Sequence, residues 1–177
     1  MTIKLRLVLL IATGLLTALI MSLAGYLGNT RMADAVQDND VSMTVLRNHM
    51  EADMMHDALR ADVLSAMLVG LGKSTSTAAE VNSSIKEHAE HFREVLADNL
   101  KLPLDASIKA SLEKIKPSLD TYISAGERIV ALALENPEAA RGELQTFNAA
   151  FSQLEEQMAA LSELIENNTQ LTSTGTR

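Results

Sequence analysis

The feature that most constrains this sequence is an uncharged, almost wholly apolar run from Leu7 to Leu27. About twenty apolar residues are needed for a helix to cross the hydrocarbon core of a bilayer, and a single segment there can satisfy its backbone groups only as a helix. Lys4 and Arg6 precede the run, and cationic flanks stay on the cytoplasmic side. We therefore expect a cytoplasmic N-terminus at residues 1–6 and a transmembrane helix at residues 7–28.

A cleaved signal peptide is the alternative interpretation of this run. Ser22-Leu23-Ala24 has the small-x-small pattern of a cleavage site. However, the run is long for the apolar part of a signal peptide, and a helical pattern resumes at Met32. These observations favour an uncleaved anchor in the inner (cytoplasmic) membrane, with residues 29–177 in the periplasm as one domain.

After the apolar run the sequence predicts an all-α domain. Apolar residues recur at alternating spacings of three and four, and Pro and aromatic residues are few. Thr77 with Glu80 forms a capping-box pattern, and Asn136 followed by Pro137 is typical of a helix start. The expected helices cover about residues 32–70, 78–101, 105–135 and 137–168. Because short turns join them, we expect an antiparallel up-down four-helix bundle that continues the N-terminal transmembrane helix.

The first helix of this bundle carries charged residues in an otherwise apolar stripe. The stripe consists of Met32, Val36, Asn39, Met43, Leu46, Met50, Asp53, Asp57, Arg60, Leu64, Met67 and Leu71. If this stripe is buried, its charges are costly unless they are paired or solvated by a ligand. The charged layer is therefore a ligand site, a satisfied polar layer of the core, or part of a face that is turned toward water.

Two polar residues of other helices are expected near this layer. Reflection about the predicted turns places His88 at the height of Arg60 and brings Tyr122 within about two turns of it. Arg60 is suited to bind a carboxylate through paired hydrogen bonds. The predicted ligand-binding residues are Arg60, Asp57, His88, Tyr122 and Asp53, and the predicted ligand is a small carboxylate or amino acid. Alternatively, Asp57 and Arg60 form an internal pair or lie at a dimer face.

The histidines suggest a second kind of site. Asp53, His56 and His88 could hold Zn²⁺ or Ni²⁺ in a metal-sensing bundle. A di-iron enzyme is disfavoured, because no Glu-x-x-His motif occurs. We expect no enzyme and no cofactor, since we find no nucleophile–base pair, phosphate-binding loop or nucleotide motif. The formal net charge of −8 argues against a nucleic-acid partner.

Four segments of the sequence resemble a known family. They are MMHDALRADVLSAML, EHAEHFREVL, YISAGERIV and FNAAFSQLEEQM, one in each predicted helix of the bundle. Together with the single apolar anchor they resemble methyl-accepting chemotaxis proteins over essentially the whole chain. The resemblance implies a periplasmic sensory bundle that forms a homodimer, binds a small molecule between helices and transmits the signal by helix displacement. It also implies a second membrane helix and cytoplasmic output domains, which this sequence does not contain.

The resemblance bears on where the ligand would bind. Amino-acid-binding members of the family hold the ligand carboxylate with several arginines, whereas the first bundle helix here offers only Arg47 and Arg60 after Arg31. This favours a site within one protomer over a site at the dimer interface. Met54 and Met55 cannot both face one seam, so one of them is expected to face a second protomer. A structural or adaptor bundle without a ligand is a further alternative.

Overall fold

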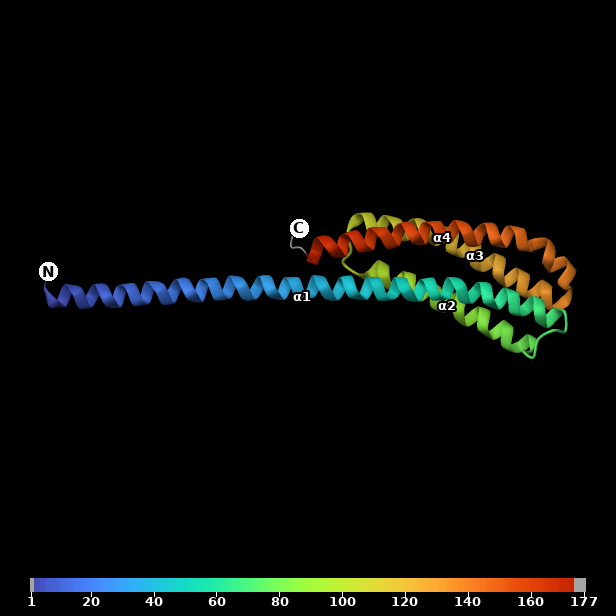
Figure 1. Ribbon diagram of the computed structural model, residues 1–177, viewed down its shortest axis with the longest axis horizontal. Helices are drawn as coiled ribbons and strands as arrows, with labels where there is room; N and C mark the ends of the chain where they lie inside the picture. The colour runs from blue at the N-terminus through green and yellow to red at the C-terminus, as the bar shows by residue number, and fades with distance from the viewer. Residues whose placement is uncertain (1, 174–177) are drawn as a thin grey trace. The chain divides into compact units, whose positions relative to one another are not determined.

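The computed structural model describes residues 2–173, and these residues form four α-helices and no strand (Figure 1). Their bounds are α1 Ile3–Gly70, α2 Ala78–Lys101, α3 Ala106–Glu135 and α4 Pro137–Ser173. The chain divides into two compact units, Met1–Asp40 and Val41–Arg177, which are described separately below. The predicted all-α class is confirmed.

The described part of the first unit consists almost entirely of the N-terminal part of α1. Its side chains are exposed nearly throughout, and an 18-residue window within α1 reaches a mean hydropathy of 2.5. Thr13 and Thr17 donate their hydroxyl hydrogens to backbone carbonyls of the preceding turn, which satisfies these groups without water. Among the described helices only α1 is long and apolar enough to cross a membrane, a test that a signal sequence also passes.

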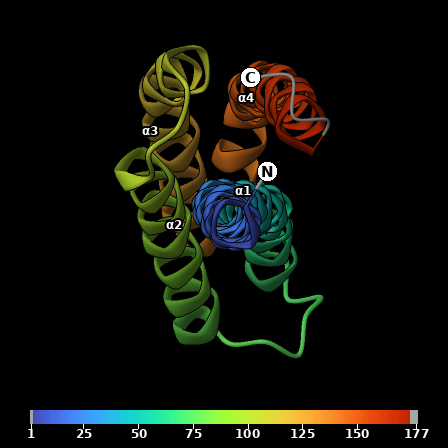
Figure 2. The same cartoon turned by 90° about the vertical axis from the view of Figure 1, so that its left-hand side faces the viewer.

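The second unit is an antiparallel bundle of α2, α3, α4 and the part of α1 from Val41 onward. Figure 2 looks along the helices, with α3 and α4 in the upper half of the view and α2 below α3. Gly126 of α3 marks a level at which all of them meet, because a Cβ atom there would lie 3.4 Å from Phe147, 3.5 Å from Ile85 and 3.6 Å from Val63. Among the largest fully buried side chains are Leu59, Ile85, Phe92, Ile115, Leu119, Tyr122, Phe147 and Leu154.

Local sequence signals account for where the helices begin. Thr77 accepts a hydrogen bond from the backbone N–H of Glu80 at 3.2 Å, and the Glu80 carboxylate accepts one from the backbone N–H of Thr77 at 2.7 Å, so the predicted capping box is present. Asn136 accepts from the backbone N–H of Ala139 at the start of α4. The end of α4 differs from the prediction, because the helix continues to Ser173 instead of ending near residue 168.

The buried face of α1 is not the stripe that the sequence suggested. Asp53, Asp57 and Arg60 are exposed, so this stripe is not a satisfied polar layer of the core, and of the alternatives that the sequence left open it is on a face turned toward water. The buried seam lies on a different face and consists of Val45, His49, Ala52, His56, Leu59, Val63 and Ala66. It keeps the same spacing of three and four. Burying two imidazoles, which can become neutral, costs far less than burying two carboxylates and a guanidinium, so the ionic residues stay in water.

Candidate functional site

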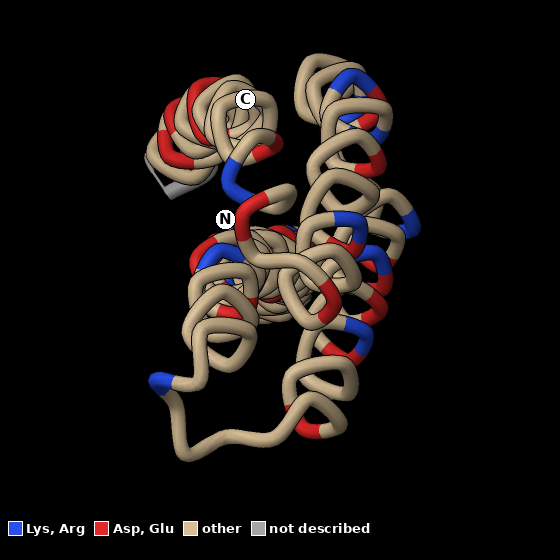
Figure 3. The backbone as a smooth tube through the Cα atoms, turned by 90° about the vertical axis from the view of Figure 1, so that its right-hand side faces the viewer, with Lys and Arg blue, Asp and Glu red and all other residues tan. Residues whose placement is uncertain are grey.

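A groove of about 310 Å³ runs between α1 and α4. It is lined by Leu46, His49, Met50, Asp53, Glu155, Met158, Ala159, Ser162 and Glu166. Asp53, Glu155 and Glu166 make its charged lining wholly acidic, apart from the imidazole of His49. The groove is acidic because α4 carries many Glu residues and only one Lys or Arg, Arg141. Figure 3 shows the acidic residues of α4 in red. Such a groove attracts a cationic group.

One to two turns further along α1, the side chain of Arg60 contacts α4. The guanidinium carbon of Arg60 lies 4.5 Å from the centroid of the Phe151 ring, a cation–π contact between α1 and α4. The His56 ring also stacks on Phe151, with centroids 4.0 Å apart and planes 10° from parallel. Arg60 is therefore held against α4 while it remains exposed.

His56 is the buried centre of this region. Burial lowers its pKa, opposed by a backbone hydrogen bond with Phe151 and by the negative charges of Asp57, Asp53 and Glu155. Its Nε2 atom is buried without a hydrogen-bond partner among the described residues. Three carboxylates thus act on one neutral imidazole at the α1–α4 boundary, where an added positive charge would be favourable.

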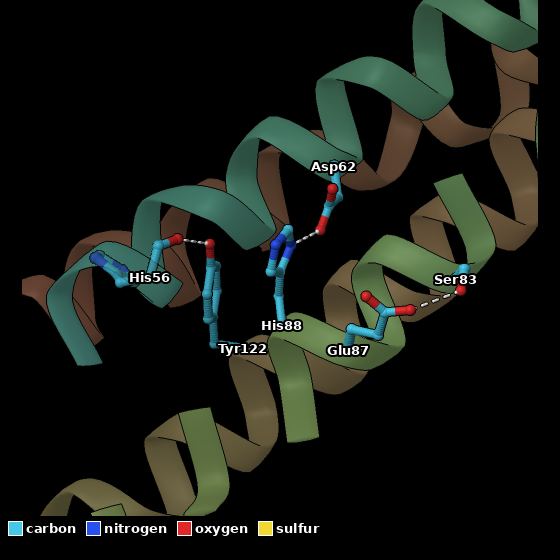
Figure 4. Close-up of polar contacts among 6 residues, drawn as sticks. All are labelled: His56, Asp62, Ser83, Glu87, His88 and Tyr122. Carbon is cyan, nitrogen blue, oxygen red and sulfur yellow. Dashed lines mark hydrogen bonds and ion pairs between the residues drawn. The ribbon is translucent and has the colours of Figure 1, made fainter. Parts of the chain in front are cut away.

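Tyr122 belongs to the core and not to an open site. It is fully buried, and its hydroxyl donates a 2.8 Å hydrogen bond to the backbone carbonyl of His56 (Figure 4). Its ring packs near His56, Phe147 and Phe151. Burial raises the pKa of Tyr122 well above its ordinary value. The residue therefore fixes α3 to α1, and its only donor is already used.

His88 lies in a different interface, between α1 and α2. Its Nδ1 atom is 2.7 Å from a carboxylate oxygen of Asp62 (Figure 4). The Asp62 side chain is 11% exposed and that of His88 34%. Burial raises the pKa of Asp62, and the hydrogen bond from His88 opposes this effect. Reflection about the first turn gave the height of His88 correctly to within one turn, but the sequence analysis missed Asp62 as its partner.

The predicted site residues therefore separate into three groups. Asp53, Asp57 and Arg60 lie on the exposed side of α1 near α4, Tyr122 lies in the core, and His88 pairs with Asp62. Arg60 and Tyr122 both contact Phe151, whereas His88 pairs with Asp62 at the α1–α2 interface, so the three predicted residues do not converge in one site. Asp62 is the neighbour of Val63 in the buried seam of α1. A correct assignment of that seam would therefore have indicated that Asp62 is buried and needs a polar partner such as His88.

The alternative metal site is not supported by the geometry. His56 stacks on Phe151 of α4, whereas His88 is bound to Asp62 on the α2 side of α1. Within residues 2–173 no group of three or more His, Asp or Glu side chains is arranged to hold a metal ion. The set of Asp53, His56 and His88 is thus a wrong prediction of a ligand cluster.

The second unit is an antiparallel four-helix bundle with a groove between its first and last helices. The chain belongs to the family described as four helix bundle sensory modules for signal transduction, whose family model matches residues 1–176. The predicted membership in the chemotaxis-receptor family is confirmed by this match. It is a family of signal-transduction modules and not of enzymes. Comparison with curated proteins and with solved structures gives no significant match.

Proposed function

We propose that this chain is the sensory part of an inner-membrane chemoreceptor, with its bundle in the periplasm. The apolar run of α1 supports a membrane anchor, and Lys4 and Arg6 before it support a cytoplasmic N-terminus. The family of sensory modules supports the signalling role.

We propose further that the bundle binds a small amino acid at the boundary between α1 and α4. The observation that carries this proposal is the acidic groove next to a held arginine. Asp53 and Glu155 suit an ammonium group, and the Arg60 guanidinium on the same boundary suits a carboxylate. A ligand with a carboxylate alone would be repelled by three acidic side chains. Of the two ligand classes that the sequence predicted, this lining therefore favours the amino acid.

The signal would arise because the ligand bridges two helices. A ligand that contacts both α1 and α4 favours the helix spacing at which both of its charged groups are bound. It shifts the population toward that spacing only by its difference in affinity for the two arrangements. Displacement of α1 along α4 is a motion of the kind that packed helices allow.

We also propose that the receptor is a homodimer that forms through α1. Large apolar side chains recur on its exposed face at helical spacing: Met43, Met50, Met54, Leu64 and Leu68. A regular apolar stripe outside the core is typical of a helix that packs against another helix. Met54 is 64% exposed whereas Met55 packs against the core, so Met54 is the residue proposed to face the second protomer.

Calorimetric titration of the full chain in detergent micelles tests the ligand site. The panel contains amino acids, the amines that lack their carboxylate and the carboxylates that lack their ammonium group. We expect amino acids to bind more tightly than either partial analogue. Replacement Arg60→Ala should weaken amino-acid binding by about tenfold or more, as expected for loss of a charge-assisted hydrogen-bonded pair.

Arg47→Ala is the matched control, because Arg47 is also an exposed arginine of α1 but pairs with Glu51 at 4.0 Å. It should leave the affinity within about twofold. Unchanged amino-acid affinity in Arg60→Ala, or simple carboxylates that bind more tightly than amino acids and lose affinity in Arg60→Ala, would contradict the proposed site.

A further inference from the structure

A second groove, between α2 and α3, has the opposite chemistry to the acidic groove of α1 and α4. It has a volume of about 260 Å³ and is lined by Arg93, Leu96, Ala97, Leu100, Lys116, Leu119 and Asp120. Leu96 and Leu119 are buried. Core packing holds these two side chains in place, and they form an apolar part of the groove lining.

The charged groups at this groove carry a net positive charge. Arg93 donates from its Nε to Asp120 across the two helices at 3.2 Å, so these two charges offset each other. A guanidinium carries further N–H donors beyond Nε. Lys116 is exposed, and among the ion pairs of the described residues none includes it. The groove therefore offers an uncompensated ammonium group next to an apolar surface, on a protein whose net charge is −8.

We propose that the α2–α3 groove is a binding site for a small amphipathic carboxylate, such as an aromatic or short aliphatic acid. Its apolar part would cover Leu96, Leu100 and Leu119, and its carboxylate would pair with Lys116 and accept from Arg93. An apolar cavity of about 150 Å³ holds one benzene molecule, so 260 Å³ is sufficient for a single ring with its carboxylate. Charge complementarity selects the acid over the corresponding alcohol or amine.

This site is independent of the proposed amino-acid site. It shares no residue with the α1–α4 groove and lies on the other two helices. The carboxylate class that the sequence predicted for Arg60 has a better chemical match here, because the only carboxylate at this groove, Asp120, is already paired with Arg93.

Benzoate is the probe, titrated into the full chain in detergent micelles and followed by calorimetry and by protein NMR shifts. We expect a dissociation constant on the order of 1 mM for so small a ligand, and weaker binding of benzyl alcohol and benzylamine. Lys116→Ala should weaken benzoate binding by about fivefold or more. Ala97→Phe places a ring on the exposed lip of the groove and should compete with benzoate for the same space.

Lys114→Ala is the matched control. Lys114 lies two positions away on α3 but lines a different groove, toward α4, with Ser111 and Gln157. It should change benzoate affinity by less than about twofold. No benzoate binding to the unmodified chain, or binding that neither Lys116→Ala nor Ala97→Phe weakens, would overturn the proposal. A change of oligomeric state in Ala97→Phe without benzoate binding would instead assign the groove to a second copy of the chain and also overturn it.

Discussion

Between Val45 and Gly70, α1 carries two apolar stripes on different faces of one helix. The buried stripe includes His56 and Leu59 and packs against the other three helices. The exposed stripe includes Met54 and Leu64, whose exposed fractions are 64% and 53%. The two faces also differ in how their carboxylates are stabilised. The one buried carboxylate of α1, Asp62, is paired with His88, whereas the exposed carboxylates are solvated by water. Apolar periodicity alone therefore does not identify which face of α1 is buried. The positions of the unpaired charged residues distinguish the two faces, because such residues remain in water.

The largest expected difference between the two faces is in core packing. Leu59 is 1% exposed, and Leu59→Ala should lower the free energy of unfolding by about 2–5 kcal/mol, since it leaves a cavity. Leu64→Ala on the exposed face should change it by less than about 1 kcal/mol. Thermal and chemical unfolding followed by circular dichroism measures both. Equal losses would mean that the two faces have been assigned the wrong way round.

The next difference concerns carboxylates on the two faces. Asp62→Ala removes the partner of His88 and should lower the free energy of unfolding by about 1–2 kcal/mol. We expect no larger loss, because the His88 side chain is 34% exposed and water can replace part of the interaction. Asp57→Ala should have little effect, because Asp57 is exposed. The same unfolding measurements apply. A loss in Asp57→Ala as large as that in Asp62→Ala would mean that the carboxylates of the two faces do not differ in their contribution to stability.

The exposed stripe itself is tested through dimerisation. Met54→Ser should raise the dimer dissociation constant by about tenfold, since part of a methionine side chain would no longer be buried between protomers. Analytical ultracentrifugation in detergent measures this constant. Glu113→Ser, at an exposed position of α3, is the control and should leave it unchanged.

Cross-linking offers a second measurement, because the chain has no cysteine of its own. Met54→Cys should give disulfide-linked dimers on oxidation, and Glu113→Cys should not, since only α1 would bring two copies within disulfide range. A monomeric chain, or equal cross-linking at both positions, would refute the proposed interface.

The fold was predictable wherever the signal is local. Thr77 with Glu80, and Asn136 with Pro137, fix helix starts through groups only three residues apart, and the structure has both. Helix number and antiparallel order follow from such signals together with the short turns. The end of α4 was misjudged because its last turns are polar, although Thr169 and Asn168 bond to Ile165 and Asp105 there.

The site was predictable only in part, because it depends on which face of α1 is buried. Counting from Met32 gives a stripe through Arg60 that shares Met43, Met50 and Leu64 with the exposed face of α1, and no local interaction distinguishes this stripe from the buried seam. The height of His88 was recoverable, because axial rise along a helix is fixed. Its partner Asp62 was not, because the rotation of α1 about its axis is set by packing against the other helices.

The smallest expected effect is a pH dependence that arises from the buried face. Burial lowers the pKa of His49 and of His56 below the ordinary value of 6.5, and nearby carboxylates offset this only in part. The unfolded chain therefore takes up protons at these residues before the folded chain does. Their contribution to stability is fully present above pH 6.5 and is lost as the pH falls from 6.5 through their folded values.

Asp62 acts in the opposite direction at lower pH. Because burial raises its pKa above 3.8, the folded chain takes up this proton first, and acidification through that range adds stability. We therefore expect the free energy of unfolding to fall on acidification from pH 7 and then to level off as Asp62 is protonated.

His56→Phe should flatten the first part of this profile, because a phenyl ring can keep the stacking on Phe151 without titrating. His91→Phe is the control, since the His91 side chain is 47% exposed and forms only contacts of 3.8 and 3.9 Å with Glu51 and Glu94. If the slope is the same in both variants, the pH dependence does not come from the seam of α1.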